Sequence, residues 1–192
     1  MMPLSPPMPL APDHRDAERG WRLWLPNVLL FQLCWFAAIL GAAHGLPWLG
    51  LAAIVVVVLF HLLRARVPGR ELRLIAVLVA IGWGYESLPY ALGWIAYTDH
   101  AGVFVPFWMV ALWANFATVL NVSLRSLRQR PVLLALLGGI GGPLAYWGGQ
   151  SLGAATWLEP MPLLVYLALG WSVLTPLLAR LAIHLDGYDH GR

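Results

Sequence analysis

One carboxyl group stands inside a long apolar stretch, and it is the strongest candidate for chemistry in this sequence. Glu86 follows Arg73 by 13 residues, which in a helix is about 20 Å, the outer half of a hydrocarbon core about 30 Å thick. An ionisable group at such a depth costs about 2.5 to 3.5 kcal/mol, so these groups usually face a bundle interior or a water-filled cavity and serve a function. A purely structural hydrogen bond is the alternative that stays open.

Amides and aromatic side chains in other apolar stretches are expected to share a cavity with this carboxyl group. Asn115 lies nearest to the middle of the membrane, and we expect it to pair with Glu86. Helix packing is the competing explanation, because amides also hydrogen-bond between transmembrane helices. The further candidates to line the cavity are Gln32, Gln150, Trp113 and Tyr146.

Glycine and proline gather in one apolar stretch, where Gly138, Gly142 and Pro143 lie close together. A helix broken at this point would expose backbone carbonyls to a solute. The spacing of the two glycines also fits close contact with another helix, which is the favoured interpretation. Pro89, one turn after Glu86, predicts a kink that frees the carbonyl of Tyr85.

Other chemistry finds little support. The histidines lack partners at metal-ligand spacing, and the lone cysteine, Cys34, lies in an apolar stretch. The sequence has no CxxC motif and no Ser-His-Asp order. The arginines are dispersed and form no long basic run. We therefore expect no metal, no cofactor and no nucleic-acid partner.

The elements that must position these residues are membrane-spanning helices. The 192 residues are 60% hydrophobic and only 11% charged, which is too apolar for a soluble domain of this size. Apolar stretches long enough to cross a bilayer predict an all-α polytopic bundle with six spans. They lie near residues 27–44, 46–63, 73–92, 103–122, 131–152 and 161–182.

The 12 arginines give the orientation, because they occur only in the N-terminal tail, in every second loop and near the C-terminus. The positive-inside rule therefore places both termini in the cytoplasm, which requires an even number of spans. Residues 1–26 are proline-rich and then charged, and are expected to form a disordered tail. The expected six-helix transmembrane domain covers 27–185, and 186–192 form a short cytoplasmic tail.

Several strings resemble a known family: Phe31-Gln32 with Trp35, Glu86-Ser87, Ala111 to Arg125, and Gly141 to Trp147. They are similar to the small bacterial inner-membrane proteins of the domain of unknown function 2878 family, from Asn27 to Leu181. The resemblance implies a multi-pass protein of a bacterial inner membrane and implies no activity. The residues before Asn27 are an addition to the family pattern.

The leading hypothesis is a bundle that binds or transports a lipidic or small amphiphilic solute, with Glu86 as the polar anchor and membrane lipid as a partner. An intramembrane lipid-modifying enzyme that uses Glu86 as general acid or base is an alternative. It is weaker, because the sequence shows no evident nucleophile. A structural scaffold that binds a membrane-protein partner through the glycines of 131–152 is the third hypothesis.

Overall fold

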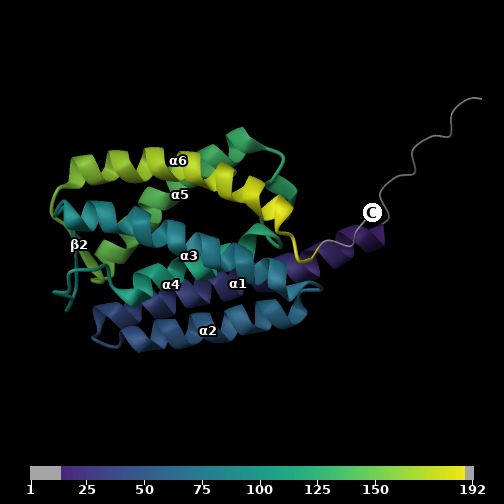
Figure 1. Ribbon diagram of the computed structural model, residues 1–192, viewed down its shortest axis with the longest axis horizontal. Coiled ribbons are helices and arrows are strands. Elements are labelled where there is room, and N and C mark those ends of the chain that lie inside the picture. The colour runs from purple at the N-terminus through teal and green to yellow at the C-terminus, as the bar shows by residue number, and fades with distance from the viewer. Residues whose placement is uncertain (1–13, 189–192) are drawn as a thin grey trace, which may run out of the picture.

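The computed structural model describes residues 14–188 and confirms the all-α fold class. Six helices run antiparallel and nearly side by side, and a short two-stranded sheet lies at one end of the bundle (Figure 1). The helices are α1 (His14–Ala43), α2 (Pro47–Arg64), α3 (Pro68–Ala91), α4 (Phe107–Leu120), α5 (Pro131–Ser151) and α6 (Pro160–His184). A short 3-10 helix, η1 (Arg125–Leu127), precedes α5.

Prolines begin four of these helices, because a first helical residue has no hydrogen bond to lose. Three of these starts agree with the expected spans to within a residue. The fourth, at Pro68, precedes the expected start at residue 73. Glu71 therefore lies inside the helix, where its side chain is buried.

Helix α1 starts earlier than expected. It begins at His14, so residues 14–26, which were predicted to be disordered, belong to a helix that continues through Pro26. Residues 1–13 of the predicted tail lie outside the described residues, as do 189–192 of the predicted C-terminal tail.

Helix α4 is shorter than the expected span of residues 103–122. Its 14 residues correspond to about 21 Å, less than a hydrocarbon core of about 30 Å. The helix begins after Pro106 and ends before Asn121, whose side chain is drawn into a polar cluster described below. The other five helices are long and apolar enough to cross a membrane.

A short antiparallel sheet joins the α3–α4 loop to the α5–α6 loop. Strand β1 (Ile95–Tyr97) pairs antiparallel with β2 (Ala155–Trp157), with Ala96 opposite Thr156. Gly93 and Gly153 precede the strands with positive φ angles of 69° and 86°, which favour glycine. We call this the sheet end of the bundle.

The opposite end carries the loops α2–α3 and α4–α5, and we call it the arginine end. Arginines lie in these loops or in the helix ends beside them: Arg64, Arg66, Arg70, Arg73, Arg125, Arg128 and Arg130. The start of α1 and the end of α6 also lie there (Figure 1). Along the outside of the bundle, large apolar side chains such as Leu63 and Leu169 are exposed. Several long helices with such apolar surfaces indicate a multi-pass membrane protein.

Candidate functional site

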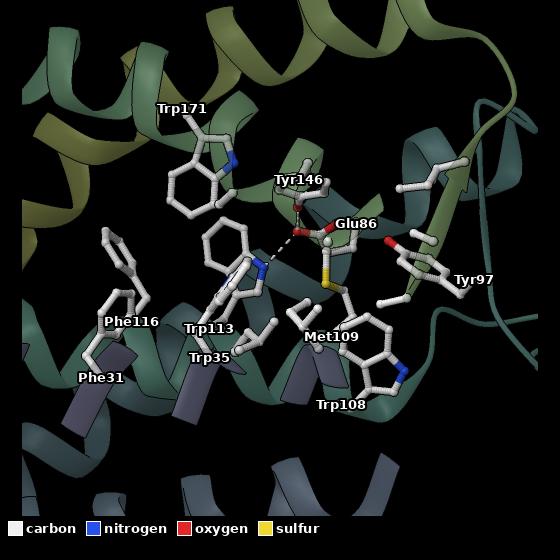
Figure 2. A pocket seen from close by; sticks show the side chains of 17 residues that line it. Phe31, Trp35, Glu86, Tyr97, Trp108, Met109, Trp113, Phe116, Tyr146 and Trp171 are labelled. Carbon is white, nitrogen blue, oxygen red and sulfur yellow. Dashed lines mark hydrogen bonds between the residues drawn. The ribbon is translucent and has the colours of Figure 1, made fainter. Parts of the chain in front are cut away.

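Glu86 lies on α3 near the sheet end and is completely buried, with 0% of its surface exposed. Its Oε1 atom accepts a hydrogen bond from the indole Nε1 of Trp113 on α4, at 2.9 Å, and another from the hydroxyl of Tyr146 on α5. Three helices thus converge on one carboxylate oxygen (Figure 2). The structure brings together three of the residues that the sequence predicted for the cavity.

The second oxygen of this carboxyl group, Oε2, accepts no hydrogen bond from any described residue. Glu86 is among the residues that line a cavity of about 90 Å³. The hydroxyl of Tyr97 on β1 points toward Glu86 from the other side and is also without a hydrogen bond (Figure 2). Since a single water needs roughly 10–15 Å³, this cavity has room for a small polar group.

The two-stranded sheet covers one end of the cavity, because Ile95, Tyr97 and Ala155 belong to the cavity lining. Gln150 stabilises this closure, since its Oε1 accepts a 2.7 Å hydrogen bond from the backbone nitrogen of Trp157. The predicted cavity residue Gln150 therefore supports the cover and is not part of the cavity lining.

Two glycines allow large aromatic rings to approach the helices around this cavity. A Cβ atom at Gly82 would overlap the ring of Trp113, and one at Gly142 would overlap Trp171. Trp113 and Trp171 stack with their centroids 5.0 Å apart and an interplanar angle of 20°. The indole that donates to Glu86 is therefore held by close packing on α3 and by stacking on α6.

Tyr85 and Tyr166 join α3 to α6 beside the carboxyl group. The hydroxyl of Tyr166 donates to the backbone oxygen of Tyr85 at 2.7 Å. In return, the hydroxyl of Tyr85 donates to the backbone oxygen of Tyr166 at 3.3 Å. Their rings stack at 4.6 Å. This reciprocal arrangement holds the part of α3 that carries Glu86 in place.

A larger groove of about 500 Å³ lies between α1 and α5, over α4 and α6. Its lining is mainly apolar, and it includes Gln32, which is exposed at the groove. Trp171 Nε1 and Thr175 Oγ1, both on lining residues, have no hydrogen-bond partner among the described residues. The groove and the small cavity adjoin, because both are lined by Phe31, Trp35, Phe116, Ala145 and Trp171.

A family comparison covers this whole region. The family described as a protein of unknown function (DUF2878) matches residues 24–177. The chain belongs to this family. All residues that line the cavity and the groove fall within the matched range, and the expected family membership is confirmed. No curated protein and no solved structure matches the chain.

Asn115 of this DUF2878 protein does not pair with Glu86, contrary to expectation. Its Nδ2 atom donates to the backbone oxygen of Phe31 on α1 at 3.0 Å, and its backbone oxygen accepts from Thr118. Asn115 and Trp113 are two residues apart on a helix and so point to different sides. Asn115 therefore attaches α4 to α1, which is the packing alternative.

Helix α5 is continuous through Gly138, Gly142 and Pro143, so no break exposes its carbonyls. A Cβ atom at Gly138 would overlap Thr175 and the backbone oxygen of Trp171. The two glycines thus serve close packing between α5 and α6. Pro89 likewise lies inside a continuous helix, α3.

A second polar cluster at the arginine end escaped the sequence analysis. Glu71 on α3 is completely buried, and its Oε2 lies 2.9 Å from His61 Nε2 on α2. Its Oε1 accepts from Asn121 Nδ2 at 2.8 Å and from the backbone nitrogen of Gly187 at 2.7 Å. The sequence does contain one signal for this cluster, because Glu71 is a lone acidic residue within an arginine-rich segment.

The segment that follows α6 is bound into this cluster. Asp186 forms an ion pair with Arg128 at 2.9 Å, and Arg128 also donates to Asn121 Oδ1. The hydroxyl of Tyr188 donates to the backbone oxygen of His61 at 2.5 Å. Asp186 and Tyr188 lie beyond the range matched by the family. We regard the cluster as structural, because its charges are paired within the chain.

The chemistry available at the Glu86 site is that of one carboxyl group among aromatic rings. No arginine or histidine is among the described residues that line the cavity, and no serine or cysteine is among them either. Groups of three or more potential metal ligands are absent from the described part of the chain. The site is therefore suited to holding a polar group within an apolar surrounding.

Proposed function

We propose that this membrane protein binds a lipidic or small amphiphilic solute, with the polar head group at Glu86 and the apolar chain in the groove between α1 and α5. The observation that carries the proposal is the completely buried Glu86, which lines a cavity and whose Oε2 has no hydrogen-bond partner among the described residues. Buried polar atoms nearly always have a hydrogen-bond partner, so an unpartnered carboxylate oxygen calls for one.

The adjoining groove supports an amphiphile over a wholly polar solute. Its volume of about 500 Å³ and its apolar lining fit an alkyl chain. Exposed residues at its edge, among them Gln32, Leu137 and Leu144, open it to the outside of the bundle. In a membrane, that surface faces lipid, so a chain can enter sideways from the bilayer.

Binding is favoured over catalysis by the composition of the site. A general acid or base needs a reacting partner, and the described residues that line the cavity at Glu86 include no serine, cysteine or histidine. Trp113, one of the two residues that donate to Glu86, is held by packing against Gly82 and by stacking on Trp171. A rigid, preorganised polar anchor fits recognition of a head group.

Lipid extraction from the purified protein tests this proposal. Wild-type protein purified in a maltoside detergent would be extracted and its bound amphiphiles identified by mass spectrometry. Gly141 lines the groove, and a Cβ atom there meets no atom within 4 Å, so we choose Gly141→Phe to place a large side chain at the groove. Gly84, which also has open space but lies on the exposed side of α3, supplies the matched control Gly84→Phe.

We expect a defined amphiphile on the wild type and on Gly84→Phe, and a strongly reduced amount on Gly141→Phe. Wild-type protein that carries no amphiphile above the level of Gly141→Phe would show that the proposal is wrong.

A further inference from the structure

We infer that the head group bound at Glu86 is an ammonium group, so that the ligand is an amphiphile with a primary or methylated amine. This inference rests on the proposed function and adds the chemical class of the ligand. Three features of the site carry it: a buried carboxyl group with no cationic residue among the described residues of the cavity lining, the aromatic walls of the cavity and its small size.

The first feature is charge. A carboxyl group buried in apolar surroundings either takes up a proton or keeps its charge with the help of a counter-charge or of enough hydrogen-bond donors. Trp113 and Tyr146 both donate to Oε1 of Glu86, and the Tyr97 hydroxyl, which points toward the carboxyl group, is the remaining potential donor. No cationic side chain is found among the described lining residues. A ligand cation beside Oε2 would supply the missing counter-charge.

The second feature is the aromatic lining. Eight of the 17 residues around the cavity are aromatic. Trp113 packs against Gly82, stacks on Trp171 and donates a hydrogen bond to Glu86. Trp35 and Trp108 form other parts of the cavity wall (Figure 2). Tryptophan rings attract cations most strongly among the aromatic side chains, and cages of this kind bind quaternary ammonium groups.

The third feature is size. The cavity of about 90 Å³ admits a compact group, and it adjoins the groove at Trp35 and Trp171. A phosphate or sulfate head group would place a second negative charge beside Glu86, which is unfavourable at any such distance. A compact cation on an alkyl chain satisfies the charge, the walls and the volume together.

The main competing ligand is a neutral amphiphile, such as an alcohol, hydrogen-bonded to the carboxyl group. Four probes with the same chain distinguish these cases: dodecyltrimethylammonium, dodecylamine, dodecanol and dodecanoate. Binding would be measured on the full chain in nanodiscs of phosphatidylglycerol, a lipid that has no amine. Glu86→Gln keeps the shape of the side chain and removes its ability to carry a charge. Glu159→Gln, at an exposed residue of the sheet end, is the matched control.

We expect the two ammonium probes to bind the wild type and Glu159→Gln at least about 10-fold more tightly than dodecanol, with dodecanoate the weakest. In Glu86→Gln this preference should disappear. Trp35→Leu, which leaves the carboxyl group in place, should lower the affinity for the ammonium probes and change that for dodecanol little. This second variant keeps the test decisive if Glu86→Gln fails to fold.

Equal binding of dodecanol and the ammonium probes, or a preference that survives in Glu86→Gln, would overturn the inference and leave the proposed function standing. If none of the probes binds and no amphiphile is extracted from the wild type, the proposed function itself is wrong.

Discussion

Gly82 on α3 lies so close to the indole ring of Trp113 on α4 that a Cβ atom at position 82 would overlap the ring. The same indole donates to the Glu86 carboxylate, one turn further along α3. The absence of a side chain at residue 82 is thus a condition for the hydrogen bond at residue 86. The packing of α3 on α4 and the geometry of the candidate site depend on each other.

Gly82→Ala is therefore expected to destabilise the protein by about 1–3 kcal/mol, the usual penalty of overpacking. Gly84→Ala, two residues away on the exposed side of the same helix, has open space and should be neutral or slightly stabilising, because alanine favours helix. Thermal unfolding in detergent compares the two variants. Equal melting temperatures would contradict the packing described for Trp113.

The contact between α5 and α6 gives an analogous pair of adjacent residues. Gly142→Ala should move Trp171, because a Cβ atom there meets the indole ring, whereas Gly141→Ala meets no atom within 4 Å. We expect a loss of about 1–3 kcal/mol for the first and little change for the second. Tryptophan fluorescence and thermal unfolding would record both effects, and a larger loss for Gly141→Ala would show that α5 is rotated differently.

Removal of the buried carboxylate at the arginine end should be more severe. Glu71→Ala leaves Asn121 Nδ2, the backbone nitrogen of Gly187 and the ring of His61 without their acceptor. Breaking such a buried polar pair costs about 3–5 kcal/mol. Glu159→Ala, at an exposed loop position, is the control and should change stability by less than about 0.5 kcal/mol. Similar unfolding curves for the two variants would refute a structural role for Glu71.

The segment after α6 should respond to strongly alkaline pH. Burial, together with the nearby Glu71 carboxylate, raises the pKa of Tyr188 to about 12, although Arg64 lowers it in part. Since an unperturbed tyrosine titrates near about pH 10, the folded state holds the proton more tightly. Its contribution to stability is full below about pH 10 and is lost as the pH rises through about 12.

Tyr188→Phe should remove this part of the pH dependence. Spectroscopic titration of tyrosinate in the wild type and the variant would isolate Tyr188 as their difference. A midpoint of the difference curve near that of free tyrosine would contradict the burial of Tyr188 against His61.

Some properties of this protein follow from the sequence alone, because they depend on local composition. Transfer of apolar side chains into lipid is nearly additive along a helix, so hydropathy and length predict membrane helices. Prolines at Pro47, Pro131 and Pro160 mark helix starts for an equally local reason, the missing backbone donor. The burial of Glu86 was expected on the same grounds, since its stretch is apolar on both sides.

The tertiary structure decided which groups meet. Asn115 and Trp113 both lie on α4, yet only Trp113 faces Glu86, because the rotation of a helix about its axis is set by packing against its neighbours. Glu71 is buried because residues from α2, from the end of α4 and from the segment after α6 converge on it. The groove between α1 and α5 likewise has no sequence signal, since it results from the placement of separate helices. Such contacts depend on non-local geometry, which hydropathy and spacing do not encode.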